Sequence, residues 1–542
     1  MKRDESIQAL ADADEVWDVL VVGGGATGLA TAMDAAARGF RTALVERDDF
    51  GKGTSSRSTK LIHGGFRYLK QGNVPLVMES LHERGLLLRN APHIVRPLSF
   101  VVPTYRWWEA PFYMAGLKLY DALAGSLGIA PADLLNPAET VELIPTIETD
   151  RLTGGVQYYD GQFDDARLAV CMARTTSGLG GVVANHVKVE SFLKSGGRIE
   201  GVEARDLESD EELKIRTKVT INATGVFTDE LRRIDDAGAD GMMMTSQGVH
   251  IVLDRVFLPG DSAIMIPKTD DGRILFAIPW QDRVVIGTTD TPLPEPMPEP
   301  RARPDEIAFL IEHAGRYLTK DPTESDVLSV FAGLRPLVKA GDGRDTSKLS
   351  RNHRIVVSDS GLVTITGGKW TTCRRMAEDT IDQAIKVGGL ERRQEATTEL
   401  RLHGAPGMAR HRPSVRAQAE PCPALRAETR DVDHDWRDYG EDAAELAALV
   451  QNDPTLGERL HPELPYCGAE IVHGARHEMA RDLEDILSRR TRALLLDAEA
   501  ACEIAPRVAA LLAAELGRDK AWERAELKSF AELAAGYRID RS

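Results

Sequence analysis

The chain has 542 residues, of which 42% are hydrophobic and 28% charged, and its formal net charge is −17. This length exceeds what one hydrophobic core supports, so two or three domains are expected. The negative charge argues against general nucleic-acid binding, because a phosphate backbone needs a basic surface. No uninterrupted run of about 18 apolar residues is present, and the polar residues 1–17 do not resemble a signal peptide.

The first structural motif lies in residues 18–46, which read as an apolar strand, a glycine-rich turn, an alanine-rich helix and a second strand. Gly23 permits a tight turn, Gly25 lets the backbone approach a pyrophosphate, and Gly28 lets the helix pack close to the strand. The pyrophosphate is expected at the helix N-terminus. Glu46 ends the second strand and can accept both hydroxyls of an adenosine ribose, which disfavours NADP. The complete arrangement predicts a dinucleotide site.

Two segments in the middle of the chain are predicted to return to this first domain. Residues 182–189 form a β-like run that includes Val187, and residues 218–225 form an apolar strand that ends in a turn at Gly225. Between residues 248 and 290, short runs of β-branched residues alternate with turn residues. This alternation is typical of an antiparallel sheet, and it predicts a second domain.

A third return is predicted at residues 362–366, an apolar strand that Gly367, Gly368 and a helix follow. Repeated returns suit a long cofactor such as FAD, because its flavin end must be held far from its pyrophosphate. Backbone N–H groups at the two glycines would point at the flavin N1/O2 edge, where negative charge accumulates on reduction. Cys373, on the helix, is interpreted as a small core residue.

The domain organisation follows from these returns and from two changes of composition. A Pro-, Ala- and Arg-rich stretch without periodicity predicts a linker, and the alanine- and leucine-rich stretch after it has helical periodicity. The predicted boundaries are 15–240 and 350–390 for a discontinuous FAD-binding domain, 241–349 with parts of 90–160 for a substrate-binding sheet domain, 391–430 for the linker, and 431–542 for a C-terminal helical domain.

The segment of residues 53–69 carries a resemblance to a known family. Its sequence is Gly-Thr-Ser-Ser-Arg-Ser-Thr-Lys-Leu-Ile-His-Gly-Gly-Phe-Arg-Tyr-Leu, and with the glycine motif it resembles the FAD-dependent glycerol-3-phosphate dehydrogenases. Further segments agree with that family in order, at residues 159–168, 287–290, 333–337, 367–372 and 489–492. The resemblance implies an α/β fold with a Rossmann-like FAD-binding domain of the glycine/D-amino-acid oxidase type, an antiparallel substrate domain and an all-helical C-terminal domain.

The resemblance also implies the reaction and the cofactor contacts. The reaction is oxidation of sn-glycerol 3-phosphate at C2 to dihydroxyacetone phosphate, with hydride transfer to FAD N5 and reoxidation by a membrane quinone. Besides the glycines and the acid of the first motif, the cofactor is expected to contact Thr54, Ser55, Ser58, Lys60, Leu61, His63, Val187, Gly225, Gly367, Gly368 and Thr371.

The substrate carries a dianionic phosphate, which needs several cations at one point. Arginine suits this task best because its planar fork bonds bidentately. Arg67, Arg335, Arg351 and Lys369 match the family's positions, and Tyr68 can donate to the phosphate. An isolated arginine would otherwise be assigned to a surface salt bridge.

The C2 hydroxyl must lose a proton as the hydride leaves, and a base with a pKa near neutrality serves best. His63 is the first choice, although it can instead hydrogen-bond the flavin and hold its orientation. Together with Arg335 and Lys369 it makes up the predicted catalytic set. His250, at the head of a substrate-domain strand, is a secondary candidate for substrate binding.

Residues 101–120 are unusually aromatic in a chain with only 6% aromatic residues. Trp and Tyr with a few cations favour the headgroup level of a bilayer. A monotopic contact with the inner face of the cell membrane, which would let a quinone reach the flavin, is therefore one interpretation. An interdomain core segment is the other. The net negative charge weakens docking on anionic lipid.

The C-terminal helices show no recognisable catalytic constellation. Arg489 to Arg492 can pair with the FAD-binding domain or face solvent, and packing, homodimer formation and regulation remain open roles for the domain. No Asp-x-[Asp/Asn]-x-[Asp/Asn]-Gly calcium loop is found, so a bacterial type of enzyme is expected. Five scattered cysteines without a Cys-x-x-Cys pair are typical of reduced thiols in a cytoplasmic protein, and no metal is expected.

Three alternatives compete with this interpretation. A glycerol-3-phosphate oxidase would use O2 in place of the quinone, and the sequence does not distinguish the two. An amine or amino-acid oxidase would need no second cation for a phosphate, so Arg67, Arg335 and Lys369 disfavour it. A flavin-binding protein without catalysis is disfavoured by the intact motifs around His63 and Lys369.

Overall fold

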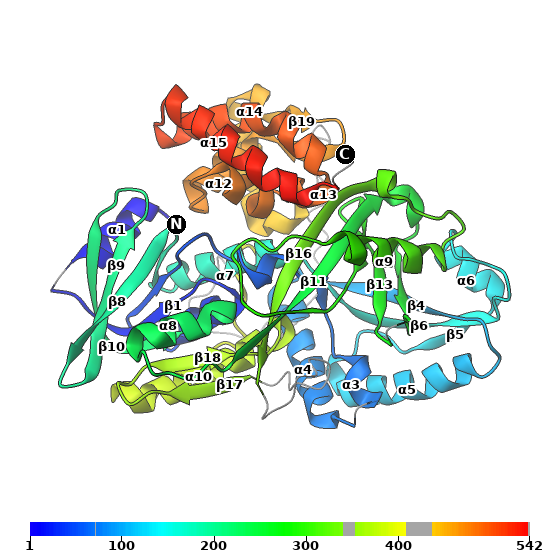
Figure 1. The fold of residues 1–542 in the computed structure, drawn as a ribbon, viewed down its shortest axis with the longest axis horizontal. Helices are drawn as coiled ribbons and strands as arrows, with labels where there is room; N and C mark the ends of the chain where they lie inside the picture. Colours follow the sequence, from blue (N-terminus) through cyan, green and yellow to red (C-terminus); the bar gives the residue numbers. More distant parts are fainter. Residues whose placement is uncertain (13, 71, 271, 340–352, 408–435, 540–542) are drawn as a thin grey trace.

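Two large β-sheets lie side by side in the described part of the chain, and the C-terminal helices lie over the junction between them (Figure 1). A two-stranded sheet lies in the C-terminal region, which is therefore not all-helical as the resemblance implied. The computed structural model describes residues 1–12, 14–70, 72–270, 272–339, 353–407 and 436–539. Within this part of the chain, none of the helices combines the length and the apolar content that crossing a membrane requires.

The first sheet has a parallel core in which strands distant in sequence are neighbours. Its order is β18-β10-β1-β2-β7, with β17 antiparallel at the β18 edge and the β8-β9 hairpin attached to β10. The bounds are β1 Val16–Val22, β2 Thr42–Val45, β7 Val182–Ala184, β8 Val187–Ser195, β9 Arg198–Asp206, β10 Glu212–Asn222, β17 Arg354–Val357 and β18 Val363–Thr366. All three predicted returns of the chain are strands of this sheet. The run 182–189 is divided between β7 and β8 at His186, which has φ 54°.

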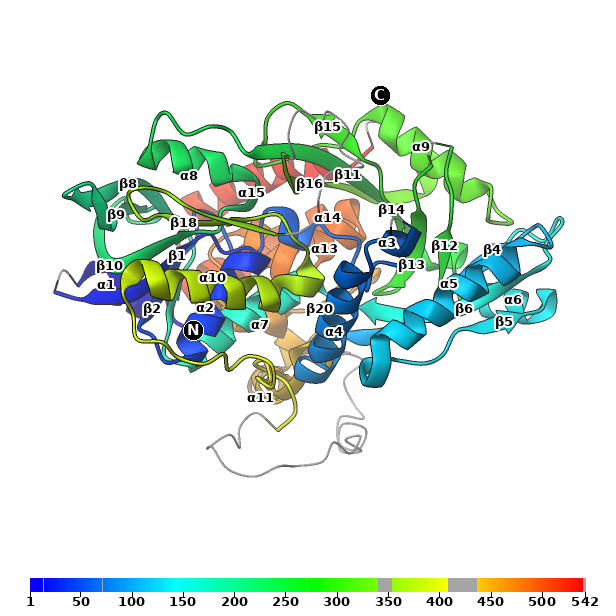
Figure 2. The same cartoon turned by 90° about the horizontal axis from the view of Figure 1, so that it is seen from below.

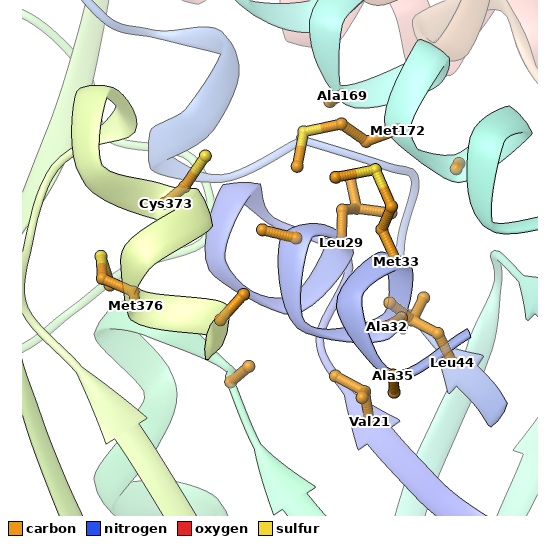
Figure 3. Close-up of a cluster of buried hydrophobic side chains, with 14 of the residues drawn as sticks. Val21, Leu29, Ala32, Met33, Ala35, Leu44, Ala169, Met172, Cys373 and Met376 are labelled. Carbon is orange, nitrogen blue, oxygen red and sulfur yellow. The ribbon is translucent and has the colours of Figure 1, made fainter. Parts of the chain in front are cut away.

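Three helices pack together on one face of this sheet and enclose its core: α2 Ala26–Ala37, α7 Asp165–Gly178 and α10 Cys373–Gly388. Figure 3 shows Leu29 and Met33 of α2 close to Met172 of α7, with Cys373 of α10 in the same cluster. Burial raises the pKa of the Cys373 thiol to about 12. The interpretation of this cysteine as a core residue is confirmed. Two further helices of this part are α1 Arg3–Ala11 and α8 Thr228–Asp235.

The contact between α2 and β1 explains one glycine of the first motif. A side chain at Gly28 would overlap the carbonyl oxygen of Gly23, so the helix could not approach the end of the strand as it does. The close approach leaves the N-terminus of α2 directly beside the turn. The packing role predicted for Gly28 is therefore confirmed.

The second sheet is mostly antiparallel, as predicted for residues 248–290. Its order is β15-β11-β14-β13-β12-β4-β6-β3, with β16 paired to β11 and β5 paired to β6; β12 and β4 are parallel. The bounds are β3 Leu61–Ile62, β4 Arg96–Thr104, β5 Asp133–Leu135, β6 Gly154–Gln162, β11 Met243–Asp254, β12 Ser262–Ile266, β13 Leu275–Trp280, β14 Arg283–Gly287, β15 Thr291–Leu293 and β16 Val327–Val338.

Helices cover both faces of the second sheet. On one face, Ile307 and Leu310 of α9 share a core with strand residues such as Val249. On the other face, α4 and α5 enclose Phe100 and Val102 of β4 (Figure 2). The bounds are α3 Phe66–Lys70, α4 Val74–Asn90, α5 Glu109–Ala124, α6 Pro137–Leu143 and α9 Pro304–Gly315.

The C-terminal helices dock on the second sheet through an apolar face. Leu483, Ile486, Leu487 and Leu494, predicted to lie on or near one face, are fully buried and share a core with Phe331 of β16. The elements of this region are α11 Ala443–Asn452, β19 Arg459–His461, β20 Leu464–Cys467, α12 Gly468–His477, α13 Ala493–Leu496, α14 Ala498–Leu516 and α15 Lys520–Ala534.

The described part of the predicted linker, residues 391–407, forms neither helix nor strand. It is nevertheless held against the first domain. Leu402 and Ala405 are buried, and the Leu402 N–H donates to the Asn90 carbonyl oxygen at 2.9 Å. The predicted linker residues 408–430 lie outside the described residues.

The arginines of residues 489–492 are buried and paired, which decides between the two expectations for them. Arg489 and Arg490 donate to the carboxylate of Asp49 at 2.5–2.8 Å. Arg492 donates to Asp165 Oδ1 at 3.1 Å and to the Ser56 carbonyl oxygen at 2.7 Å. The C-terminal region is therefore joined to the first domain by charge as well as by apolar contact.

Asp165 gathers polar groups from two other parts of the chain, the segment 58–60 and the C-terminal region. Asp165 is the first residue of α7, and its carboxylate accepts from Lys60 Nζ at 2.7 and 2.9 Å. It also accepts from the Ser58 N–H at 3.0 Å, from the Ser58 hydroxyl at 2.7 Å and from Arg492. Asp165 and Lys60 are both fully buried. Burial acts to raise the pKa of Asp165, but Lys60 and Arg492 outweigh it and hold the pKa below its ordinary value.

We expect Asp165→Asn to lower the free energy of unfolding by about 3–5 kcal/mol, because two buried cations lose their counter-charge. The measurement is denaturant unfolding of the FAD-loaded protein. The matched control is Asp210→Asn, which removes the same charge from an exposed pair with Arg205 and should change stability by about 1 kcal/mol or less. Equal effects of the two substitutions would contradict the role given to Asp165.

Candidate functional site

Two cavities lie along the region where the first and second sheets meet. The first cavity has a volume of about 400 Å³ and is lined by the ends of β1, β2 and β10 and the start of β8. The second cavity has a volume of about 170 Å³ and is lined mainly by the second sheet and by residues 59–68. A cavity at the carboxyl ends of parallel strands is where α/β folds bind ligands.

The first cavity brings together seven of the fifteen residues predicted to contact the cofactor. Those that line it are Gly23, Gly25, Glu46, Thr54, Ser55, Val187 and Gly225. They come from five stretches of chain, and 202 positions separate Gly23 from Gly225. The parallel pairing of β1 with β2 and β10 places Gly23, Glu46 and Gly225 at the same end of the sheet.

The N-terminus of α2 faces the first cavity. Gly25 is the N-cap residue, and the Ala26 N–H donates to Ser55 Oγ at 2.9 Å, which holds the loop of residues 53–58 against the helix. The helix dipole makes this position favourable for an anion such as a pyrophosphate.

Glu46 follows β2 and is fixed beside the glycine turn at the first cavity. Its carboxylate accepts from the Gly24 N–H at 2.5 Å and the Asp48 N–H at 2.8 Å. Burial, with the charge of Asp48, raises its pKa. A carboxylate held in this way has further lone pairs for ribose hydroxyls.

Two polar residues expected at the cofactor have side chains directed elsewhere, and these expectations are corrected. The Lys60 ammonium donates to Asp165 and to the Ser56 carbonyl oxygen, and it lies between the rings of Trp280 and Phe331 at 5.3 and 5.1 Å. Ser58 donates its hydroxyl to the same carboxylate. A buried carboxylate attracts these groups more strongly than a solvated cleft does.

The second cavity contains several residues that were predicted for the substrate and several that were not. His63, Tyr68 and Arg335 line it, and so does Leu61, which was expected at the cofactor. The lining residues that the sequence did not single out include Arg273, Asp290, Tyr158, Asp160 and Phe276. Asp290 lies in a segment matched to the family. Arg273 precedes a strand, and nothing in the sequence marks it as a cavity residue.

The turn after His63 is fixed by a buried hydrogen-bond network. The Gly64 N–H donates to Tyr120 Oη at 2.8 Å and to Asp160 Oδ1 at 3.3 Å, and Arg84 donates to the same carboxylate at 2.7 Å. Burial raises the pKa of Asp160. A side chain at Gly64 would overlap Leu81 and Tyr120. The network therefore determines where His63 is presented.

A second contact ties His63 to the loop that follows β18. The His63 N–H donates to Thr371 Oγ1 at 3.3 Å, and the Thr371 hydroxyl lies 3.3 Å from the His63 carbonyl oxygen. In the same loop, Trp370 Nε1 donates to the Ser55 carbonyl oxygen at 2.8 Å. The loop of Gly367 to Thr372 thus contacts residues of both cavities, and it joins them into one elongated site.

Lys369 of this loop lies beside the second cavity. Its Nζ is 2.6 Å from Ser80 Oγ and 4.8 Å from the ring centroid of Tyr68, which lines the cavity. The loop therefore brings Lys369 to Tyr68 although 300 residues separate them in the sequence.

Arg335 is held in the second cavity by four acceptors. Its guanidinium donates to the carbonyl oxygens of Gln247 and Thr289 at 3.2 and 2.8 Å, to Thr288 Oγ1 at 3.0 Å and to Asp290 Oδ1 at 3.1 Å. A guanidinium held this firmly loses little conformational entropy when it binds a ligand.

His250, predicted as a secondary substrate residue, is instead part of the core. It is 2% exposed, its ring stacks on Phe331 at 4.8 Å, and its Nε2 lies 2.9 Å from Thr59 Oγ1. Burial, with the charges of Lys60 and Arg335, lowers its pKa well below the ordinary value. His250 also lies within β11, which begins at Met243, and not at the head of a strand as predicted.

Two predicted substrate residues cannot be placed at the cavity. Arg67 belongs to α3, and its side chain lies outside the described part of the structure. Arg351 lies outside the described residues.

Comparison with known families assigns two parts of the chain. Residues 18–374 match the family of FAD dependent oxidoreductases, and residues 395–523 match the C-terminal domain of alpha-glycerophosphate oxidase. The two matches together cover both sheets and most of the C-terminal helices.

Individual relatives are similar over nearly the whole chain. A mitochondrial glycerol-3-phosphate dehydrogenase of Macaca fascicularis is 40% identical over 99% of this chain and 76% of its own length. A mitochondrial glycerol-3-phosphate dehydrogenase of Arabidopsis thaliana is 38% identical over 99% and 89%. The X-ray structure of the glycerol-3-phosphate dehydrogenase from Bacillus halodurans, complexed with FAD, superposes with a TM-score of 0.74 at 27% identity, over 99% of this chain and 97% of that one.

Proposed function

The chain belongs to the FAD-dependent glycerol-3-phosphate dehydrogenase family, and on that basis we propose that it oxidises sn-glycerol 3-phosphate at C2 to dihydroxyacetone phosphate. The observation that carries the proposal is the second cavity, where His63, Tyr68, Arg273 and Arg335 surround a small volume at one end of an elongated site. A volume of about 170 Å³ suits a small ligand, since drug-sized sites measure roughly 300–1,000 Å³.

The residues present fit FAD. Gly25 and the N-terminus of α2 suit its pyrophosphate, Glu46 suits the adenosine ribose, and the loop of Gly367 to Thr372 reaches from the first cavity to His63. When bound, FAD supplies the hydride acceptor. The chain's own contribution is to position the substrate, to take its proton and to exclude water.

Phosphate binding is assigned to the cations around the second cavity. Arg335 and Arg273 line it, and Lys369 lies beside Tyr68 at its edge. Hydrogen bonds to a charged phosphate are stronger than neutral ones. An amine or amino-acid substrate carries no dianionic group to pair with these cations, so a phosphate-bearing substrate is the better match.

The proton of the C2 hydroxyl is assigned to His63. The buried contacts of Gly64 and Thr371 hold the histidine backbone on both sides, so the imidazole is presented to the second cavity with little freedom. Histidine is the side chain that most often serves as a general base. The alternative role, orienting the flavin through a hydrogen bond, uses the same position.

A quinone is proposed as the electron acceptor, and an exposed apolar helix supports this choice. This aromatic surface lies on α5 and on the turn before it. It consists of three aromatic residues and one leucine, which are exposed as follows: Trp107 84%, Trp108 42%, Phe112 53% and Leu119 50%. Exposed aromatic clusters of this kind mark contacts with membranes or partners. In the described structure one face of this segment is therefore exposed, and the other face is buried in a core.

The inner face of α5 connects this surface to the second cavity. Tyr113, Leu117 and Tyr120 are buried in the core of the second sheet, and the Tyr120 ring packs edge-on against Phe66 at 6.1 Å. Phe66 itself lines the second cavity. A lipid-soluble acceptor that enters at the aromatic surface is thus one layer of side chains away from the site, and the inner face of the cell membrane is the proposed location.

We expect anaerobic addition of sn-glycerol 3-phosphate to bleach the flavin absorption of the purified protein, and a quinone to restore it.

Arg335→Ala should keep FAD but raise the KM by about 10- to 100-fold, because a charge-assisted hydrogen bond is lost. Arg205→Ala, on the exposed β9 strand, is the control and should behave like the unchanged protein. An unbleached flavin would reject this substrate, and faster recovery with O2 than with quinone would favour an oxidase.

The substitution His63→Ala separates the two roles of the histidine. If His63 is the base, stopped-flow flavin reduction should slow by about 10²–10⁴-fold while FAD stays bound. A normal reduction rate with weakened FAD binding would assign the histidine to cofactor positioning instead. Titration of FAD into the apoprotein provides the second readout.

The double substitution Trp107→Ser/Phe112→Ser tests the membrane contact. Each buried aromatic side chain contributes about 1.5–3 kcal/mol, so flotation with phosphatidylcholine vesicles should show at least a tenfold loss of binding. Leu207→Ser, at an exposed leucine on another face, is the control and should bind vesicles normally. Vesicle binding that survives the double substitution would place the contact elsewhere.

A further inference from the structure

A histidine pair and a carboxylate converge in the C-terminal region, at a place the proposed reaction does not use. His473 and His477 are four residues apart on α12 and so lie on the same face of the helix, and their rings stack at 4.9 Å. Glu445 of α11 faces them. One ligand atom from each of the three lies within 4.8 Å of the other two.

The distances are close to those of a metal-coordination shell. Glu445 Oε2 lies 3.5 Å from His473 Nδ1 and 3.9 Å from His477 Nε2. Tetrahedral zinc with bonds of about 2.0–2.2 Å separates its ligand atoms by roughly 3.4 Å. Small rotations of the two partly exposed side chains, Glu445 and His477, would bring all three to bonding distance.

The buried histidine has an atom that the protein leaves unsatisfied. His473 is fully buried, and its Nδ1 makes no hydrogen bond within the described residues. An orphaned buried nitrogen is costly unless something binds it. The nearest charged atom to it is the Glu445 oxygen named above.

The other nitrogen of His473 has the partner expected of a metal ligand. Its Nε2 lies 3.5 Å from Glu478 Oε1, and a carboxylate at this position orients metal-binding histidines. Arg174, which pairs with Asp442 at 2.5 Å and with Glu478 at 3.6 Å, donates to this nitrogen at 3.2 Å, and the proton of the neutral ring is then on Nδ1. Metal binding through Nδ1 therefore requires the other tautomer, in which Nε2 carries the proton and donates to Glu478. The Met1 amino group, which donates to the His477 carbonyl oxygen, is a further cation nearby.

We propose that Glu445, His473 and His477 bind one divalent transition-metal ion, with Zn²⁺ as the representative ion and water in the fourth position. Two imidazoles and one carboxylate form a ligand set that zinc uses. The absence of Cys-x-x-Cys pairs excluded only thiolate sites, so the sequence carried no indication of this one.

The consequence of such a site is structural. The ion would clamp α11 to α12 next to the Asp442–Arg174 pair, which joins the C-terminal region to α7 of the first domain. Binding energy at the ion would therefore stabilise the contact between the C-terminal helices and the FAD-binding domain.

The test is a Zn²⁺ titration of the FAD-loaded, full-length protein after treatment with a chelator, followed by competition with a chromogenic zinc indicator. We expect one tightly bound Zn²⁺ per chain, and at least a tenfold loss of affinity in both His477→Gln and Glu445→Gln. These two residues are partly exposed, so FAD absorption and the unfolding temperature without zinc should be unchanged in both variants. These two measurements serve as the folding check.

His461→Gln provides the matched control, because His461 pairs with the exposed Glu503 at 3.2 Å in the same region. It should bind Zn²⁺ like the unchanged protein. Failure of the unchanged protein to bind Zn²⁺ stoichiometrically would overturn the proposal, and so would equal affinities in His477→Gln and His461→Gln. Flavin reduction by substrate does not enter this test, so the metal site and the proposed function succeed or fail separately.

Discussion

The buried carboxylate of Asp165 is the interaction on which the rest of the site depends. It binds Lys60 and Ser58 from the segment that runs between the two cavities, and Arg492 from the C-terminal region. A buried charge must be compensated by opposite charges or hydrogen bonds, so these groups stay together in the folded protein. The loop that leads to His63 is consequently anchored to Asp165. The C-terminal helices thus stabilise the active site, although among the described residues none of their side chains lines either cavity.

The anchored loop and the loop after β18 together account for the shape of the site. Trp370 contacts the Ser55 carbonyl oxygen at the first cavity, and Thr371 contacts His63 at the second. An elongated cofactor and a small anionic substrate fit this arrangement, since the anion-binding helix terminus lies at one end and the arginines lie at the other. The exposed aromatic surface of α5 lies on the side of the molecule away from the C-terminal helices, next to the second cavity (Figure 1).

Local motifs could be predicted well because their physical requirements are local. The tight packing at Gly28 and the position of Glu46 at a strand end follow from one strand, one turn and one helix. The same reasoning misplaced Lys60 and Ser58, because a polar loop and a buried ion-pair network have the same composition. His250 was also misplaced, because β11 is buried on both faces from Thr245 to Leu253, and a polar side chain in it therefore need not face a cavity. Arg273 reaches the cavity through strand pairing that no local pattern records.

By itself the sequence determined the dinucleotide turn, the antiparallel second sheet, the helical C-terminal region and, through its motifs, the family. Residue spacing predicts these features, since each one depends on neighbours a few positions apart in the sequence. Only the tertiary structure decided which charges meet. Asp165 with Arg492, Tyr68 with Lys369, and Glu445 with His473 are pairs whose members come from different elements, and burial of the surrounding apolar surface brings each pair together. Electrostatic partnership in a protein interior depends on distances of a few ångströms, and a linear pattern does not contain those distances.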